Sequence, residues 1–224
     1  MNENKINKNN LINTMIDKVK SNLKSILIVI SFIFIIFFFF QIYIFYTSSK
    51  IQNNSITFFN IQNLENNNSI NESITKLSKE NNFYGILSKL ELIEINLKEK
   101  NIDNAIKLYS ELLNEKNLDN IYKTAIAAKA SYVLIDINMK NMTKDYVATI
   151  QNFIENIDDE FNGYKGIKLE IKYLIEILEE KKNNINYLDN KKATDLYNNI
   201  MNSEITSPEL KERIHKIHEY FSYK

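Results

Sequence analysis

The feature that most constrains this chain is an uncharged apolar run from Ser25 to Ser49, which contains no proline and no glycine. A run of about 18 or more such residues is typical of a transmembrane helix, because roughly 20 residues at about 1.5 Å each cross a hydrocarbon core of about 30 Å. Gln41, the one strongly polar side chain, stands near the carboxyl end beside two tyrosines, whose rings favour the membrane interface. We therefore predict a helix that spans a membrane and contacts its lipid.

A cleaved signal peptide is the main alternative for this run. Its apolar core should span about 7–15 residues and should end at small residues of the A-x-A kind. The run here is longer, and the residues from Phe45 to Lys50 offer no such site. We expect the helix to be retained as a signal anchor.

Lysines are distributed unequally on the two sides of the run. The amino-terminal side carries five lysines, whereas on the carboxyl-terminal side Lys50 stands alone before Lys76. An excess of Lys and Arg near one end of the helix marks the cytoplasmic side. We expect a cytoplasmic tail over residues 1–24, an anchor over residues 25–48, and an exported carboxyl-terminal part.

Composition excludes several function classes. The 224 residues include 28 basic and 28 acidic side chains, so the formal net charge is zero. Nucleic-acid binding needs a basic face or stripe, and we expect no nucleic-acid partner. The chain has no cysteine, which excludes disulfides and thiolate metal ligands. Three glycines and one proline argue against turn-rich β structure and Gly-rich phosphate loops.

Beyond the anchor, apolar residues recur at spacings of three and four, which is the period of an amphipathic helix. We therefore predict an all-α fold, with residues 49–82 as an Asn-rich helical extension or a flexible tether and residues 83–224 as a helical domain. Thr143 and Ser207 suit N-cap positions, and Pro208 suits the first helical position. The predicted helices are a short one after Asn71, followed by 86–97, 102–113, 121–139, 143–154, 167–178, 193–201 and 208–221.

Two segments share a spacing of one alanine, one tyrosine and one apolar residue, namely Ala105, Tyr109 and Leu112, and then Ala193, Tyr197 and Ile200. The spacing resembles the second helix of a tetratricopeptide repeat, in which the alanine lies where two helices cross closely and the aromatic fills the gap to the next hairpin. The resemblance implies a degenerate tetratricopeptide-like solenoid of helical hairpins, in which these six residues serve repeat packing. The middle unit, around Ala148, fits poorly, and a plain helical bundle is the alternative.

The whole layout, with a short cytoplasmic tail, one anchor and an exported repeat domain, is similar to that of the YfgM-like family, the ancillary subunits of the bacterial Sec translocon. It also looks like a group of rickettsial membrane proteins. The segment from Ser207 to Arg213 resembles the family's terminal capping helix. The resemblance implies a periplasmic protein–protein interaction module whose partners are the Sec translocon or exported chaperones. It implies no cofactor, catalytic residue or metal ligand.

A membrane-tethered metal-dependent enzyme is the rival interpretation. His215 and His218 are one helical turn apart with Glu219 adjacent, and a histidine pair at i and i+3 can share a metal. Zinc hydrolase motifs of the H-E-x-x-H kind, however, need a glutamate directly after the first histidine. Ile214 and Lys216 flank His215 instead, so we favour the interaction module.

Acidic clusters occur at Asp158–Glu160 and at Glu179–Glu180. Neither cluster has the ligand spacing of an EF-hand loop, and both fall at predicted helix ends. We expect these carboxylates to be solvated.

Overall fold

The computed structural model describes residues 14–15, 17, 20–61, 67–140, 144–183 and 190–223. Within these ranges every regular element is an α-helix and no strand occurs, which confirms the all-α prediction. The chain divides into two units between Asn60 and Ile61. The cap expected at Thr143 lies outside the described residues.

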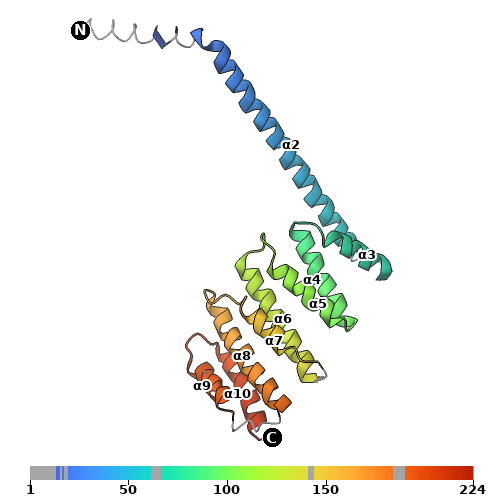
Figure 1. Cartoon of the computed structure of the whole chain (residues 1–224), viewed down its shortest axis with the longest axis vertical. Helices are drawn as coiled ribbons and strands as arrows, with labels where there is room; N and C mark the ends of the chain where they lie inside the picture. Colours follow the sequence, from blue (N-terminus) through green and yellow to red (C-terminus); the bar gives the residue numbers. More distant parts are fainter. Residues whose placement is uncertain are drawn as a thin grey trace, which may run out of the picture. The chain divides into compact units, whose positions relative to one another are not determined.

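The first unit contains α2, Leu23–Ile61, a single helix of 39 residues (Figure 1). In the described part of the chain it is the one helix long and apolar enough to cross a membrane. The helix continues without a break past Ser49, so residues 49–61 of the segment left open between helix and tether are helical. At about 1.5 Å per residue, α2 is about 58 Å long, nearly twice the thickness of a hydrocarbon core.

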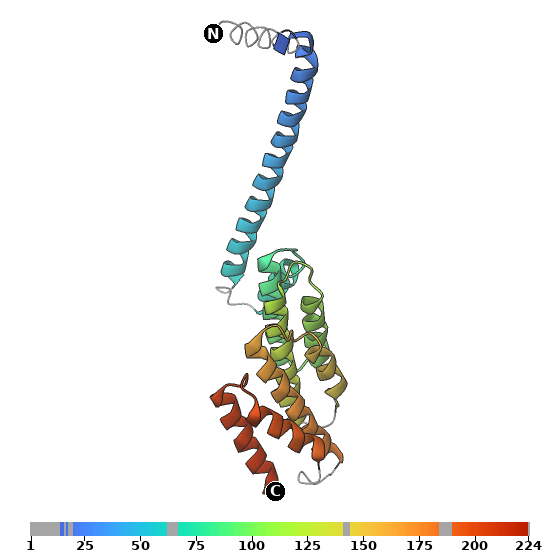
Figure 2. The same ribbon diagram turned by 90° about the vertical axis from the view of Figure 1, so that its left-hand side faces the viewer.

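The second unit is a series of helices joined by short connections (Figures 1 and 2). A helix occurs at each of these positions, but several starts differ from the prediction. α3 begins at Asn67 instead of after Asn71, and α8 begins at Asn162 instead of Ile167. α7 begins at Val147 with Tyr146 at its N-cap position, so the start expected from a cap at Thr143 is wrong. The bounds are α3 Asn67–Leu77, α4 Phe83–Lys98, α5 Ile102–Leu113, α6 Asn120–Lys140, α7 Val147–Ile154, α8 Asn162–Asn183, α9 Lys191–Asn202 and α10 Pro208–Ser222.

Consecutive helices pack against each other from α3 to α10. Two further contacts join helices that are not consecutive, namely α6 with α8 and α8 with α10. Figure 1 shows the resulting row, in which helices follow one another in sequence order. Because α3 packs on α4, the compact unit includes residues before Phe83, where the helical domain was expected to begin.

One continuous apolar core joins α4 to α10. Burying an aliphatic side chain of Ile or Leu size contributes about 1.5–3 kcal/mol relative to leaving it exposed. α6 contacts α5, α7 and α8, and three alanines and one serine are among its buried residues. Residues with 0 % exposure are Ser88, Leu112, Thr124, Ala127, Ala130, Ser131, Ile150, Ile171, Tyr173, Ile177, Ala193, Ile200 and Ile214.

Local signals explain where two of the helices begin. The Ser207 hydroxyl accepts the Leu210 backbone N–H at 3.3 Å, and Pro208 is the first residue of α10, as predicted. Gly85 in the first turn of α4 lies against the carbonyl of Glu80, where a Cβ would come within 1.8 Å of the oxygen. Only glycine fits this close approach between the chain before α4 and its first turn.

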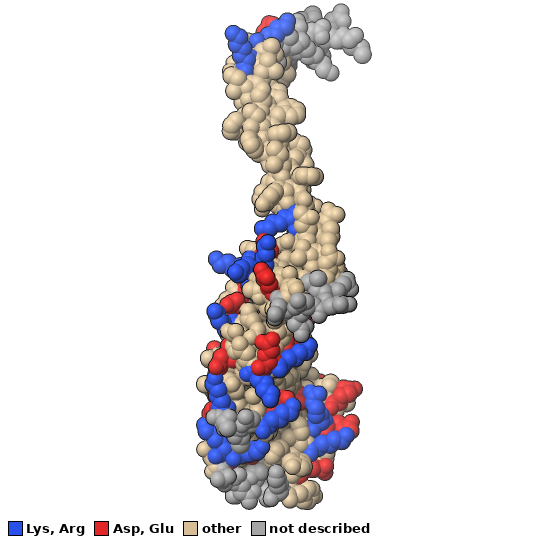
Figure 3. Space-filling model, turned by 90° about the vertical axis from the view of Figure 1, so that its right-hand side faces the viewer, with Lys and Arg blue, Asp and Glu red and all other residues tan. Residues whose placement is uncertain are grey.

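The charged side chains of the second unit are mixed in sign. Figure 3 shows blue and red residues interspersed over the face that it presents, whereas the apolar part of α2 is tan. The mixed surface agrees with the equal numbers of basic and acidic residues in the sequence. On the face shown in Figure 3, the described residues form no broad basic patch of the kind that holds a nucleic-acid backbone.

Candidate interaction surface

The six residues of the predicted repeat spacing lie at corresponding places on α5 and α9. On α5, Ala105 and Tyr109 are 1 % exposed and Leu112 is 0 % exposed; we call these three the α5 triad. The ring of Tyr109 meets that of Phe153 on α7 edge to face, with centroids 6.1 Å apart. Tyr109 therefore reaches from its own hairpin to the next one along the chain.

The equivalent residues on α9, which we call the α9 triad, are Ala193, Tyr197 and Ile200. Ala193 and Ile200 are fully buried, while Tyr197 is half-buried. The Tyr197 ring stacks on His218 of α10, with centroids 3.8 Å apart and planes 11° from parallel. Tyr197 thus contacts the helix directly after its own, whereas Tyr109 on α5 contacts α7, two helices further along the chain.

The middle hairpin, α6–α7, follows the same spacing with different residues. Ala148, on which the sequence pattern centres, is exposed. The buried side chains are Tyr146, Ile150 and Phe153, at 6 %, 0 % and 3 % exposure. Their separation of four and then three residues is that of the α5 triad, but a tyrosine stands where the other hairpins have alanine. The alanine signal is therefore missing from this unit although the buried face is present.

Both histidines face Tyr197. The Nδ1 atom of His215 lies 2.8 Å from the Tyr197 hydroxyl, and its Nε2 atom lies 3.4 Å from a carboxylate oxygen of Glu219. Burial lowers the pKa of His218, and the neighbouring His215 lowers it further. Among the described residues, no three His, Cys, Asp or Glu side chains are grouped so that they could hold a metal ion. The geometry of this pair is that of packing between α9 and α10.

A buried carboxylate that the sequence analysis missed joins three helices. Glu170 on α8 is 1 % exposed. It accepts two hydrogen bonds from the Arg213 guanidinium of α10, with Nε at 2.7 Å, and one from the Tyr132 hydroxyl of α6. Burial and the bond to Glu170 raise the pKa of Tyr132, so the phenol stays protonated as a donor. The sequence signal for this buried acid was a single glutamate among the apolar residues that recur along α8 at spacings of three and four.

A second missed carboxylate is Glu180, near the end of α8. It is 4 % exposed, not solvated as expected, and its Oε1 atom has no hydrogen-bond partner in the part of the chain that the structure describes. Burial raises its pKa to about 7, against a lowering by its bond to Asn190. Asn190 is also the N-cap of α9, where its side chain accepts the N–H groups of Lys192 and Ala193. The last turns of α8 thus contain a buried acid whose pKa is raised to about 7.

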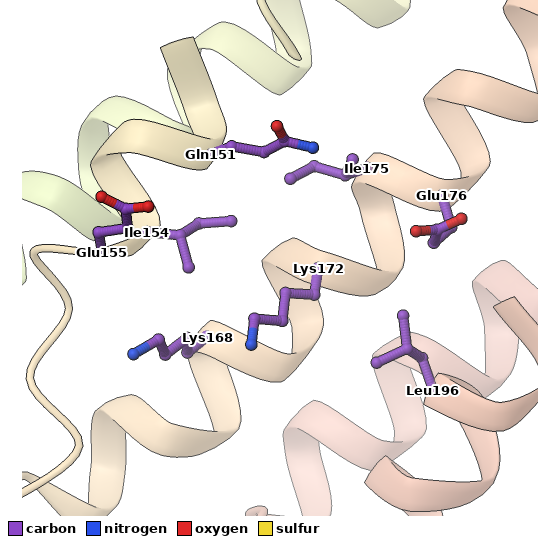
Figure 4. Close-up of a pocket in the computed structure, with 8 residues that line it drawn as sticks. All are labelled: Gln151, Ile154, Glu155, Lys168, Lys172, Ile175, Glu176 and Leu196. Carbon is purple, nitrogen blue, oxygen red and sulfur yellow. The ribbon is translucent and has the colours of Figure 1, made fainter. Parts of the chain in front are cut away.

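A groove of about 460 Å³ lies over α8 between α7 and α9. Figure 4 shows the side chains of α7 on one side, Leu196 of α9 on the other, and the amines of Lys168 and Lys172 directed from α8 into the space between them. Of its aliphatic residues, Ile154 and Ile175 belong to the core at 5 % and 4 % exposure, and Leu196 is half-buried. Its lining residues are Gln151, Ile154 and Glu155 from α7, Lys168, Lys172, Ile175 and Glu176 from α8, and Leu196 from α9.

The charges of the groove are only partly paired. The Lys168 amine donates to the Ile157 carbonyl at 2.9 Å and lies 3.1 Å from the carboxylate of Asp159. Lys172 and Glu155 are both exposed, and within the described ranges neither forms an ion pair. The groove thus has one exposed cation and one exposed anion among its lining residues.

No protein-family model matches this chain, and neither a curated protein nor a solved structure matches it. The class of this protein therefore follows from its own structure. In the described ranges it is an all-helical chain with one helix long and apolar enough to span a membrane. This helix is followed by a compact helical unit with a partly apolar groove.

Proposed function

We propose that this chain is a membrane-anchored protein–protein interaction module built from degenerate tetratricopeptide-like helical hairpins. The hairpins are α4–α5, α6–α7 and α8–α9, and α10 caps the row. The observation that carries the proposal is the repeated role of two tyrosines. Tyr109 contacts Phe153 of the next hairpin and Tyr197 contacts His218 of the capping helix, which is the packing role that the resemblance implies for the aromatic.

A row of stacked hairpins is an architecture suited to binding, because each unit contacts mainly its neighbours and the row presents an extended surface. The contacts of consecutive helices, together with those of α6 on α8 and α8 on α10, are of this kind. We propose this role over the metal-dependent enzyme because His215 and His218 are engaged with Tyr197. The ligand that we propose for the helical unit is therefore another protein.

We further propose that α2 anchors the unit in a bacterial inner membrane with the tail inside and the helical unit in the periplasm. The support is the apolar length of α2 and the lysine excess on its amino-terminal side. Confinement to a membrane raises the effective concentration toward any partner in the same membrane, so that modest intrinsic affinity suffices. The similarity in layout to the YfgM-like family makes the Sec translocon or an exported chaperone the proposed partner.

Crosslinking of the full-length protein in its own membrane tests this proposal. We expect the Sec channel or an exported chaperone among the neighbours, and we expect the same protein to co-purify after gentle solubilisation. The isolated 61–224 unit should bind that partner more weakly, because it lacks the anchor. Recovery of lipid and self-contacts alone would contradict the proposed role.

A further inference from the structure

With α2 spanning a membrane as proposed, the side-chain amide of Gln41 is a polar group in hydrocarbon. The uncharged run Ser25–Ser49 has its midpoint at Phe37, and Gln41 lies four residues further on, about 6 Å at about 1.5 Å per residue. Half the thickness of a hydrocarbon core is about 15 Å, so the amide lies well inside it. An amide in hydrocarbon without a hydrogen-bond partner costs free energy.

The chain itself provides no partner for Gln41. The most apolar 18-residue window of α2 is 0 % buried in the structure, and Gln41 is exposed. The Thr47 hydroxyl donates to the carbonyl of Tyr43 at 2.9 Å, so that polar group is satisfied within its own helix. Among the described residues, the Gln41 amide makes no such bond. Because the bilayer core holds no water to replace it, a partner has to come from another helix.

Gln41 lies on a face of α2 that has the period of two helices packed side by side. Six exposed residues at alternating spacings of three and four form this face, which we call the α2 seam: Phe34, Phe37, Gln41, Ile44, Ser48 and Ile51. Alternating spacings of this kind are the a and d positions of a coiled coil, in which a polar residue at one a position fixes the register. Ser48, seven residues after Gln41, is small and lets two backbones approach closely.

The α2 seam ends just outside the hydrocarbon. Ile51 is 14 residues beyond Phe37, about 21 Å at about 1.5 Å per residue, and it is 41 % exposed. On the same face, the next two positions, Ser55 and Phe58, are half-buried. The surface open to another helix therefore runs through the membrane and about one turn beyond it.

A second copy of this chain has the group that the Gln41 amide lacks. A carboxamide is both a donor and an acceptor, so two glutamine side chains at equal depth can exchange two hydrogen bonds. The lysine excess before α2 gives every copy the same orientation. Equal residues then lie at equal depth, and the face can meet itself about a two-fold axis. A helix of a different protein would need a polar side chain of its own at this one depth.

From these features we infer that α2 pairs in parallel with α2 of a second copy along the α2 seam, with the two Gln41 amides bonded to each other inside the membrane. The inference rests on the proposed membrane anchoring and goes beyond the proposed interaction function, because it makes the anchor a binding surface. Each assembly then carries two helical units. Two linked units bind a partner that has two sites more tightly than one unit does.

Cysteine crosslinking tests the inference on the full-length protein, because the chain has no cysteine of its own. Two versions with different affinity tags are co-expressed in a bacterial membrane, and both carry Ile51→Cys. Oxidation with copper phenanthroline should give a disulfide dimer that contains both tags, because residues facing each other across the pair come within the Cα separation of about 4.4–6.8 Å that a disulfide needs.

Asn53→Cys is the matched control, since Asn53 is also exposed and lies two residues further on, on the opposite side of the helix. For helix axes about 8–10 Å apart, its Cα atoms are about 13–15 Å from each other, too far for a disulfide. The Asn53→Cys protein should therefore crosslink at least about tenfold more slowly. Equal rates at the two positions would overturn the inference.

A second substitution in the Ile51→Cys protein tests the amide. Gln41→Leu leaves the seam apolar but removes both hydrogen bonds, and it should slow formation of the two-tag dimer about tenfold. Gln41→Asn keeps an amide and should retain most of the rate. Tyr43→Phe removes a polar group from the opposite side of α2 and should leave the rate unchanged. A rate that Gln41→Leu does not alter would show that the amides do not hold the pair.

Three further outcomes separate this inference from the proposed function. Extraction of the protein by alkaline carbonate would overturn both the anchoring and the pairing. If no two-tag dimer forms but Gln41→Leu abolishes membrane crosslinks to another protein, the helix that meets Gln41 belongs to that protein. The inference is then wrong, and the interaction function stands. If the two-tag dimer forms and no partner protein is crosslinked, the pairing stands and the proposed function fails.

Discussion

The guanidinium of Arg213 on α10 forms two hydrogen bonds with the carboxylate of Glu170 on α8, whose side chain is 2 % exposed. Arg213 is the only arginine of the chain. The planar guanidinium can meet both carboxylate oxygens at once, which the ammonium of lysine cannot do in the same fixed geometry. Removing one partner of a buried pair leaves an uncompensated charge behind. This pair therefore joins α10 to α8 in addition to the buried Leu210 and Ile214 of α10.

Arg213→Met should lower the free energy of unfolding of the 61–224 unit by about 2–4 kcal/mol, because Glu170 then stays buried without its cation. The measurement is urea denaturation followed by circular dichroism. Lys216→Met is the matched control on the same helix, since Lys216 forms only an exposed pair with Glu212, and it should leave the midpoint unchanged. Equal midpoints for the two variants would show that the pair does not hold α10.

The helical elements were predictable because their signals are local. The spacing of the apolar residues and the polar breaks between them predicted the positions of α4 to α10. Ser207 and Pro208 predicted where α10 begins. The spacing on α5 and α9 identified residues that the structure buries or half-buries. What these signals share is that each depends on residues within one or two helical turns.

The groove and the two buried carboxylates were not predictable, because they depend on contacts between distant segments. Glu170 meets Arg213 across 43 positions of sequence, and nothing in one sequence links the two. In the sequence Glu180 looks like one of several charges at a helix end, but in the folded unit it is 4 % exposed. The middle hairpin failed the alanine pattern because Tyr146 fills the position that alanine has elsewhere.

Overpacking tests the crossing of α4 and α5. Ala105 is 1 % exposed, so Ala105→Leu should force neighbouring side chains apart and cost about 1–3 kcal/mol. The same substitution at Ala148, which is exposed on α7, should be nearly neutral, since Ala and Leu are both good helix formers. Denaturation midpoints of the two variants decide the matter; an unchanged midpoint for the Ala105 variant would contradict the repeat assignment for α5.

The buried carboxylate of Glu180 predicts a dependence of stability on pH. Its folded-state pKa of about 7 lies above the ordinary value of 4.5, so the folded unit binds the proton more tightly than the unfolded chain. Its favourable contribution is complete below about pH 4.5 and is lost as the pH rises through about 7. Glu180→Gln should therefore stabilise the unit at pH 8 by about 1–3 kcal/mol.

At pH 4 the difference between the Glu180→Gln variant and the unchanged protein should vanish. Subtracting the two curves removes the opposite effect of His218, whose lowered pKa makes acid destabilise the fold. A difference that is constant from pH 4 to pH 8 would mean that Glu180 does not titrate near neutrality.

The orientation of α2 can be read without background labelling, because the chain has no cysteine. Single cysteines placed at Asn2 and at Lys224 should react differently with a membrane-impermeant maleimide added to the periplasmic side. The lysine excess before the helix predicts that the second position is labelled and the first is protected. The opposite pattern would rule out this orientation.

The two histidines give the last prediction, since packing and metal binding make different demands on Tyr197. Its ring stacks on His218 and its hydroxyl meets His215. If the cluster serves packing, Tyr197→Ala should cost about 1–3 kcal/mol through loss of the stacked ring pair and of the hydrogen bond. Tyr122→Ala, at a tyrosine of α6 that is 58 % exposed, should cost far less.

Elemental analysis of the same purified proteins should then find no stoichiometric transition metal in either. A metal bound to the unchanged protein and lost in His218→Ala would instead favour the metal-dependent enzyme, because an imidazole in the metal's coordination sphere cannot be replaced by a methyl group without loss of affinity.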